Sequence, residues 1–287
     1  MKGKDIIMKV RVVFRLRCEN SRVRSREGYL SLQRKLKKYR LKETFLDDPI
    51  YRIDQDIEAY DEMICFCEKN QKSISFVSMW YEIEITEEER RRAVAFVPCF
   101  PDYYCEEYLD GENDYNECEF CYSKRRLDNP FFVLPKGYIK SHENECGMAG
   151  MEGTGELVLL PKLVEKLIEG GVERKYFQPV MSKMKKTRGY IYWTEHVLPE
   201  GAFKDPNYKI IERCPECGAI NMEKDGRVYR IQPKSIRRDA VDELEDVNYT
   251  CEFYDEFRGI VVSKRVEKII RGNVKYAEFM PVFLEDS

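Results

Sequence analysis

Two pairs of cysteines have a spacing that could hold a metal ion. Cys118 and Cys121 lie in "CEFC", and Cys214 and Cys217 lie in "CPEC". Four cysteine thiolates around one Zn²⁺ close its coordination sphere and leave no position for water or a substrate. If the two pairs meet, they predict a structural zinc site rather than a catalytic one.

The distance between the pairs leaves other interpretations open. A local zinc ribbon separates its pairs by about 15 to 20 residues, whereas 92 residues, 122 to 213, intervene here. Two separate thiol pairs, or iron or redox chemistry, are the alternatives. A thioredoxin-like use of "CPEC" would need a long helix directly after it, and "GAINMEKDG" does not have that character.

An internal repeat gives a reason for the two remote pairs to meet. Residues 157 to 180 align without a gap to residues 259 to 282, and ten of the 24 positions are identical. Each copy begins with an apolar run, continues with apolar residues at helical spacing up to a glycine, and ends in "FQPV" or "FMPV". We expect strand, helix and strand in each copy, with the last segment at a sheet edge.

Specific residues support the helix in each copy. Pro161 suits the first helical turn of the first copy, and Ser263 is a natural N-cap in the second. One cysteine pair lies upstream of each copy. An approximate two-fold relation between the copies would therefore bring the four thiols to one zinc ion.

The chain resembles the double-CXXCG family of bacterial immunity proteins over about residues 115 to 287. The resemblance rests on "CPECGAI", the preceding Cys-x-x-Cys and the C-terminal "FRGIVVSKRVEKIIRGNVKYAEFMPV". Tyr122 stands where the family has its first glycine. The resemblance implies a protein without enzymatic activity that binds and neutralises a cognate toxin of interbacterial competition, usually encoded beside it.

Two acidic segments are candidates for the toxin-binding surface. Residues 101 to 121 and 239 to 256 each contain eight acidic and no basic side chains. Such a run is often only a solvated face, but acids interleaved with tyrosines would complement a basic toxin. The candidate partner-binding residues are Tyr103, Tyr104, Glu106, Glu107, Asp110, Asp242, Glu243 and Glu245.

The alternative function is that of a zinc-ribbon nucleic-acid-binding or regulatory protein. Basic stretches at 34 to 42 and 183 to 188 favour it, but the net charge is −3 and the pI about 5.8, so we do not expect nucleic acid as a partner. We expect no enzyme. Neither His142 nor His196 lies in a metalloprotease motif, and the glycine-rich segment 146 to 156 lacks a phosphate-loop ending.

The fold class expected is α+β, in two parts. Residues 1 to 100 form an N-terminal extension, with an alternating strand at 9 to 17, a basic helix near 28 to 42, and a capping box of Thr86 and Glu89. The segment "MICFC" reads as a strand with Cys65 and Cys67 on one face. Residues 101 to 287 form the duplicated domain with its paired zinc knuckles.

The remaining composition indicates a cytoplasmic protein. No apolar run approaches the roughly 18 residues of a membrane span, and the N-terminus alternates charge with apolar residues, so we expect neither a membrane partner nor a signal peptide. Seven further cysteines read mostly as small core residues, with His142 and Cys146 as a weak alternative metal pair. The seven are Cys18, Cys65, Cys67, Cys99, Cys105, Cys146 and Cys251.

Overall fold

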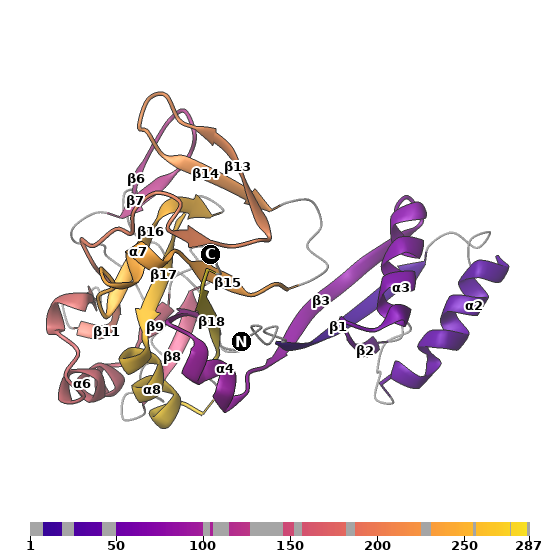
Figure 1. The fold of residues 1–287 in the computed structure, drawn as a ribbon, viewed down its shortest axis with the longest axis horizontal. Helices are drawn as coiled ribbons and strands as arrows, with labels where there is room; N and C mark the ends of the chain where they lie inside the picture. Colours follow the sequence, from indigo (N-terminus) through magenta and orange to yellow (C-terminus); the bar gives the residue numbers. More distant parts are fainter. Residues whose placement is uncertain are drawn as a thin grey trace. The chain divides into compact units, whose positions relative to one another are not determined.

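The structure is a mixed α+β protein made of two compact units (Figure 1). Unit 1 comprises Met1–Glu89 with Arg227–Gln232, and unit 2 comprises Arg90–Gly226 with Pro233–Ser287. The expected boundary lies at residue 100, whereas the units divide at residue 89. The computed structural model describes residues 8–18, 26–41, 50–99, 104–105, 115–126, 146–151, 157–181, 187–224, 231–254, 257–275 and 277–285.

Unit 1 is a three-stranded antiparallel sheet with two helices packed on it. Alternate residues of the central strand, Val12, Phe14 and Leu16, share one buried cluster with helix residues Leu36 and Tyr60. This confirms the alternation predicted at 9 to 17 except at Val13, which is buried on the other face. The elements are β1 (Lys9–Cys18), α2 (Glu27–Leu36), the 3-10 helix η1 (Lys37–Tyr39), β2 (Ile50–Asp54), α3 (Glu58–Lys69) and β3 (Ile74–Glu84).

The segment "MICFC" is helical, so the prediction of a strand there is wrong. It lies within α3, where Cys65 is exposed and Cys67 is buried. Residues two apart in a helix point to nearly opposite sides because a turn takes 3.6 residues. The buried residues Tyr60, Met63 and Cys67 have helical spacing, and a five-residue window is too short to reveal it.

The predicted capping box is confirmed at the start of α4 (Glu87–Arg92). The backbone N–H of Thr86 donates to Glu89 Oε2 at 2.7 Å, and the N–H of Glu89 donates to Thr86 Oγ1 at 3.2 Å. This reciprocal pair satisfies two N–H groups that have no partner within the helix. The short helix ends before β4 (Ala95–Pro98), as expected.

Unit 2 contains an eight-stranded sheet, a five-stranded sheet and a separate two-stranded hairpin. Their strand orders are β12-β15-β18-β4-β17-β16-β14-β13, β10-β11-β9-β8-β5 and β6-β7. In the described residues, no helix is both long and apolar enough to cross a membrane. The elements after β4 are β5 (Tyr104–Cys105), β6 (Tyr115–Glu117), β7 (Lys124–Arg126), β8 (Met148–Met151), β9 (Leu157–Leu159), α6 (Pro161–Glu169), η2 (Arg174–Tyr176), β10 (Phe177–Met181), β11 (Thr187–Tyr192), β12 (Phe203–Lys204), β13 (Tyr208–Arg213), β14 (Ile220–Lys224), β15 (Lys234–Ile236), α7 (Arg238–Val241), β16 (Val247–Tyr254), β17 (Phe257–Ser263), α8 (Lys264–Asn273) and β18 (Phe279–Leu284).

Both segments of the sequence repeat have the predicted order of strand, helix and strand. The first forms β9, α6 and β10, and the second forms β17, α8 and β18. Pro161 is the first residue of α6, and the side chain of Ser263 accepts a hydrogen bond from the Val266 N–H at the start of α8. The local start signals of both helices are therefore confirmed.

The position of the last strand differs between the segments. β10 is at the edge of its sheet, as predicted, but β18 lies between β15 and β4, so the prediction of an edge strand is wrong for the second segment. Pro281 has no N–H to donate, which normally confines proline to an edge. The pairing with β15 begins at Val282, one residue after Pro281, and this offset lets β18 lie inside the sheet.

In each segment of the repeat, a strand from outside the segment lies between the segment's own two strands. β11 lies between β9 and β10, and β4 lies between β17 and β18, with every pairing antiparallel. Tyr190 of β11 pairs with Pro179, and Phe96 of β4 pairs with Pro281, the same position of the repeat. Along the chain, β4 precedes the first cysteine pair but completes the second segment, whereas β11 precedes the second pair but completes the first.

The helices of the two segments, α6 and α8, pack against each other (Figure 1). A Cβ atom added at Gly170, after α6, would lie 2.4 Å from Cδ1 of Ile269. The Arg265 guanidinium donates to the carbonyl oxygen of Gly171 at 2.8 Å. The glycines that end α6 thus permit a close helix contact that a larger residue would obstruct.

Candidate metal centre

Each CxxC pair forms the turn of a β-hairpin. The first turn joins β6 to β7, and the second joins β13 to β14. In the first turn, the Tyr122 N–H donates to the Cys118 carbonyl at 2.8 Å, and in the second the Gly218 N–H donates to the Cys214 carbonyl at 2.9 Å. The two turns therefore have equivalent hydrogen bonds although their inner residues differ.

Tyr122 adopts the left-handed conformation that glycine favours. Its φ angle is 57°, beside 71° for the equivalent Gly218, and in the described residues Tyr122 is the one non-glycine residue with positive φ. This conformation costs an L-residue roughly 1–2 kcal/mol. The tyrosine that stands in place of a glycine therefore leaves the turn intact, at the expense of backbone strain.

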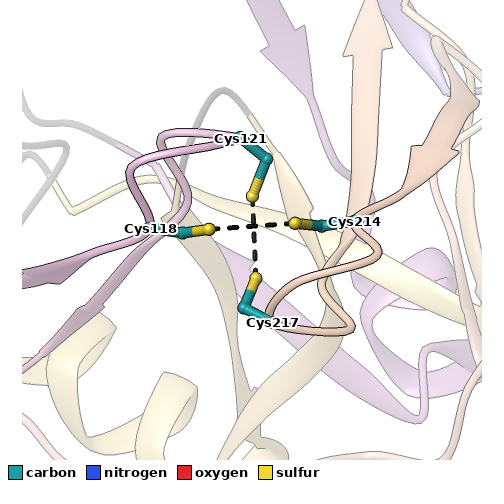
Figure 2. A group of neighbouring side chains, drawn as sticks. All are labelled: Cys118, Cys121, Cys214 and Cys217. Atoms are coloured by element: carbon teal, nitrogen blue, oxygen red, sulfur yellow. Dashed lines mark hydrogen bonds between the residues drawn. The ribbon is translucent and has the colours of Figure 1, made fainter.

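Figure 2 shows the two turns facing each other with the four cysteine sulfurs directed at one point. Cys118 Sγ lies 3.8 Å from Cys214 Sγ, Cys121 Sγ lies 3.6 Å from Cys217 Sγ, and all four sulfurs lie within 4.8 Å of one another. A disulfide bond would bring two sulfurs to about 2.05 Å. Tetrahedral Zn²⁺, with Zn–S bonds of about 2.3 Å, requires sulfur separations of about 3.8 Å. The cluster is thus compatible with a four-coordinate metal ion.

Hydrogen bonds to sulfur support the ionised form of one cysteine in each turn. Burial opposes ionisation of Cys121, but the Ser123 hydroxyl and backbone N–H lower the pKa of its thiol to about 6. The pKa of Cys217 is also lowered despite burial, by the backbone N–H of Ala219 and the Ser123 hydroxyl. Burial instead raises the pKa of Cys214 to about 11. A bound cation would offset the cost of four neighbouring thiolates, since metal-bound thiols lose their protons.

The cluster rests on an apolar base. Cys214 is 1% exposed and packs with Ala219 and Phe253, and the other three cysteines pack against this group. The Asn221 side chain also lowers the pKa of the Cys121 thiol. Ser123 and Asn221 were absent from the sequence prediction, although each follows a CxxC pair closely enough to reach the sulfurs.

The four predicted ligands are the one group of three or more potential metal ligands in the described part of the chain. Among the other cysteines, Cys67 is buried and Cys65 is exposed, so the core interpretation fails for Cys65. Burial raises the pKa of Cys99 to about 11. Cys146 and Cys251 are half-buried; Cys18 and Cys105 lie in strands, and His142 lies outside the described residues.

The structure separates the candidate partner-binding residues. Asp242 and Glu243 are exposed just after α7. Glu245 is half-buried and accepts a hydrogen bond from the Tyr176 hydroxyl at 2.7 Å, so it contributes to an internal contact. Tyr104 lies in β5, and the remaining four, Tyr103, Glu106, Glu107 and Asp110, lie outside the described residues.

A cavity of about 470 Å³ lies beside Glu245 and was not predicted. Its lining comes from η2, from the segment that follows β11, and from Glu245 itself. The lining residues are Lys175, Tyr176, Trp193, Thr194, Glu195, His196 and Glu245. Lys175 and Tyr176 both contact Glu245. Two of the charged side chains that line this cavity therefore already form an ion pair with each other, and the cysteine cluster remains the better-defined site.

Comparisons with known protein families, with curated proteins and with solved structures find no match to this chain.

Proposed function

We propose that the four cysteines bind one structural Zn²⁺. The supporting observation is the arrangement of two equivalent turns around four sulfurs within 4.8 Å of one another. Four thiolates fill a tetrahedral coordination sphere, so the ion would have no open position for catalysis. Its contribution would be to hold the hairpins β6-β7 and β13-β14 together, and hence to stabilise unit 2.

We further propose that unit 2 is an internal duplication. Two observations support a common origin of the segments 157–180 and 259–282: the ten identities of the repeat, and an antiparallel strand inserted at the same place in each. In this proposal β4 belongs to the first copy but lies between β17 and β18 of the second, and β11 belongs to the second copy but lies between β9 and β10 of the first. Neither copy would then have a complete sheet without the other. The zinc site would then be a third connection between the copies, beside the exchanged strands and the contact of α6 with α8.

We propose that the protein acts as an immunity protein that binds and neutralises a cognate toxin. The support is the resemblance of its cysteine motifs and C-terminal segment to the double-CXXCG immunity proteins, together with a metal site suited to structure rather than chemistry. The toxin would then bind to a surface of the protein rather than to the metal site. The exposed acids Asp242 and Glu243 are candidates for that surface, with the acidic segment 101–121.

Co-expression with the open reading frame beside the gene tests the immunity proposal. We expect the chain to restore growth of cells that produce the neighbouring protein, and the two proteins to co-purify. Glu243→Lys should weaken the complex about tenfold and in a salt-dependent manner, since reversal of an interfacial charge acts through long-range attraction. Glu165→Lys, at an exposed acid of α6, is the matched control.

The possible results distinguish a wrong choice of binding surface from a wrong choice of function. Undiminished binding by Glu243→Lys, and by a combined reversal of Glu106, Glu107 and Asp110, would remove the acidic segments from the interface. A harmless neighbour with no co-purification would contradict the immunity proposal itself.

A second candidate function, nucleic-acid binding, has support in unit 1. A surface hollow of about 720 Å³ is formed by α2, η1 and α3. It is lined by four basic side chains, Arg34, Lys35, Lys37 and Lys38, together with Glu58, Ala59 and Glu62. Lys35 already forms an ion pair with Glu62. Affinity for RNA or DNA that falls steeply with salt would favour this candidate.

A further inference from the structure

One edge of the eight-stranded sheet carries exposed apolar side chains. β13 ends the strand order, and β14 is its one strand partner in the described residues (Figure 1). Ile210 and Ile211, consecutive in β13, are 64% and 56% exposed. The outer side of such a strand presents N–H and C=O groups that another strand can pair with.

The sequence of β13, "YKIIER", is complementary to itself in an antiparallel register. A two-fold axis between Ile210 and Ile211 places each isoleucine opposite the other isoleucine of a second copy, and Lys209 opposite Glu212. The same axis places Tyr208 opposite Arg213. Consecutive residues of a regular strand point to opposite faces, but the register of β13 shifts between Ile210 and Glu212, which interrupts this alternation. Opposite residues of the two copies can therefore share one face of the sheet, where apolar side chains pack and opposite charges attract. Each of these pairs would occur twice in the assembly.

A bulge in β13 favours a second copy over an unrelated strand. Ile210 pairs with Met222 and Glu212 pairs with Asn221, so Ile211 is the extra residue. A bulge twists an edge strand and hinders its pairing with a regular strand. In the two-fold arrangement the identical bulges of the two copies face each other. Ile210 and Ile211 of one copy then lie opposite Ile211 and Ile210 of the other, and regular pairing continues on both sides.

We propose that two copies of this chain associate by antiparallel pairing of β13 with β13, so that their eight-stranded sheets become continuous. The interface is isologous, which means that it uses the same surface of each copy and is complete with two. The strand at the opposite edge, β12, has two residues and offers little for further pairing. This association does not depend on the identity of a toxin or on the function proposed above.

Charge exchange in the whole chain, purified as it folds, tests the register. Light scattering coupled to size-exclusion chromatography should show a concentration-dependent dimer. Lys209→Glu should weaken dimerisation about tenfold, because it places like charges opposite each other twice, and Glu212→Lys should do the same. The double variant Lys209→Glu/Glu212→Lys restores opposite charges and should dimerise like the wild type.

Lys268→Glu, at an exposed lysine of α8, matches the charge change of Lys209→Glu away from β13 and should leave the dimer intact. Circular dichroism and zinc content must match the wild type for all variants, so that a lost dimer is not lost folding. A wild type that stays monomeric at every concentration would overturn the proposal, and so would a dimer that both single reversals leave unchanged. Failure of the double variant to recover would reject the register.

Discussion

The two CxxC turns have equivalent backbones in different surroundings. The Cys214–Cys217 turn belongs to the hairpin β13-β14, which joins the eight-stranded sheet through the pairing of β14 with β16. The Cys118–Cys121 turn belongs to the hairpin β6-β7, which forms a separate two-stranded sheet. A hairpin of two strands is marginally stable alone. By this comparison the sheet supports the second turn, whereas the first turn would depend more on a bound metal ion.

The largest expected effect is the loss of a ligand. Cys118→Ser and Cys214→Ser should each release zinc and lower the melting temperature by about 10 °C or more, since the free energy of metal binding adds to the stability of the folded protein. Metal analysis and thermal unfolding measure both effects. Cys65→Ser, at the exposed cysteine of α3 in unit 1, is the control and should change neither. Full zinc content in either variant would contradict a shared site.

Removal of the metal should reveal the difference between the hairpins. After chelation, we expect the amides of β6 and β7 to exchange hydrogen at least about a hundredfold faster, and those of β13 and β14 less than about tenfold faster, since local opening follows local support. Hydrogen–deuterium exchange with mass spectrometry resolves the two segments. Equal loss of protection would show that the sheet gives the second turn no advantage.

The smallest expected effect concerns the residue after each turn. Tyr122→Gly should raise the free energy of unfolding by about 0.5–1 kcal/mol, since it relieves the left-handed backbone, whereas Gly218→Ala should lower it by about 1 kcal/mol. A Cβ atom at Gly218 would meet no atom within 4 Å, so that loss reports the backbone alone. Chemical denaturation measures both. Destabilisation by Tyr122→Gly would mean that contacts of the exposed tyrosine side chain stabilise the protein by more free energy than the left-handed backbone costs.

Much of the local structure was predictable because its causes lie within a few residues. The reciprocal hydrogen bonds of Thr86 and Glu89, the N-cap at Ser263 and the first-turn Pro161 all follow from short-range rules. The alternation of β1 likewise appears in its own residues. The segment "MICFC" was misread because it is shorter than two helical turns, and periods of two and 3.6 residues differ little over that length.

The sequence alone determined the four candidate ligands and the strand–helix–strand order of both repeat segments, because both depend on residue type and spacing along the chain. The tertiary structure decided that the turns meet although 92 residues separate them, that β11 lies between β9 and β10 and β4 between β17 and β18, and that β18 lies inside its sheet. The partner of a strand depends on long-range packing, and local periodicity carries no information on which distant strand will be adjacent.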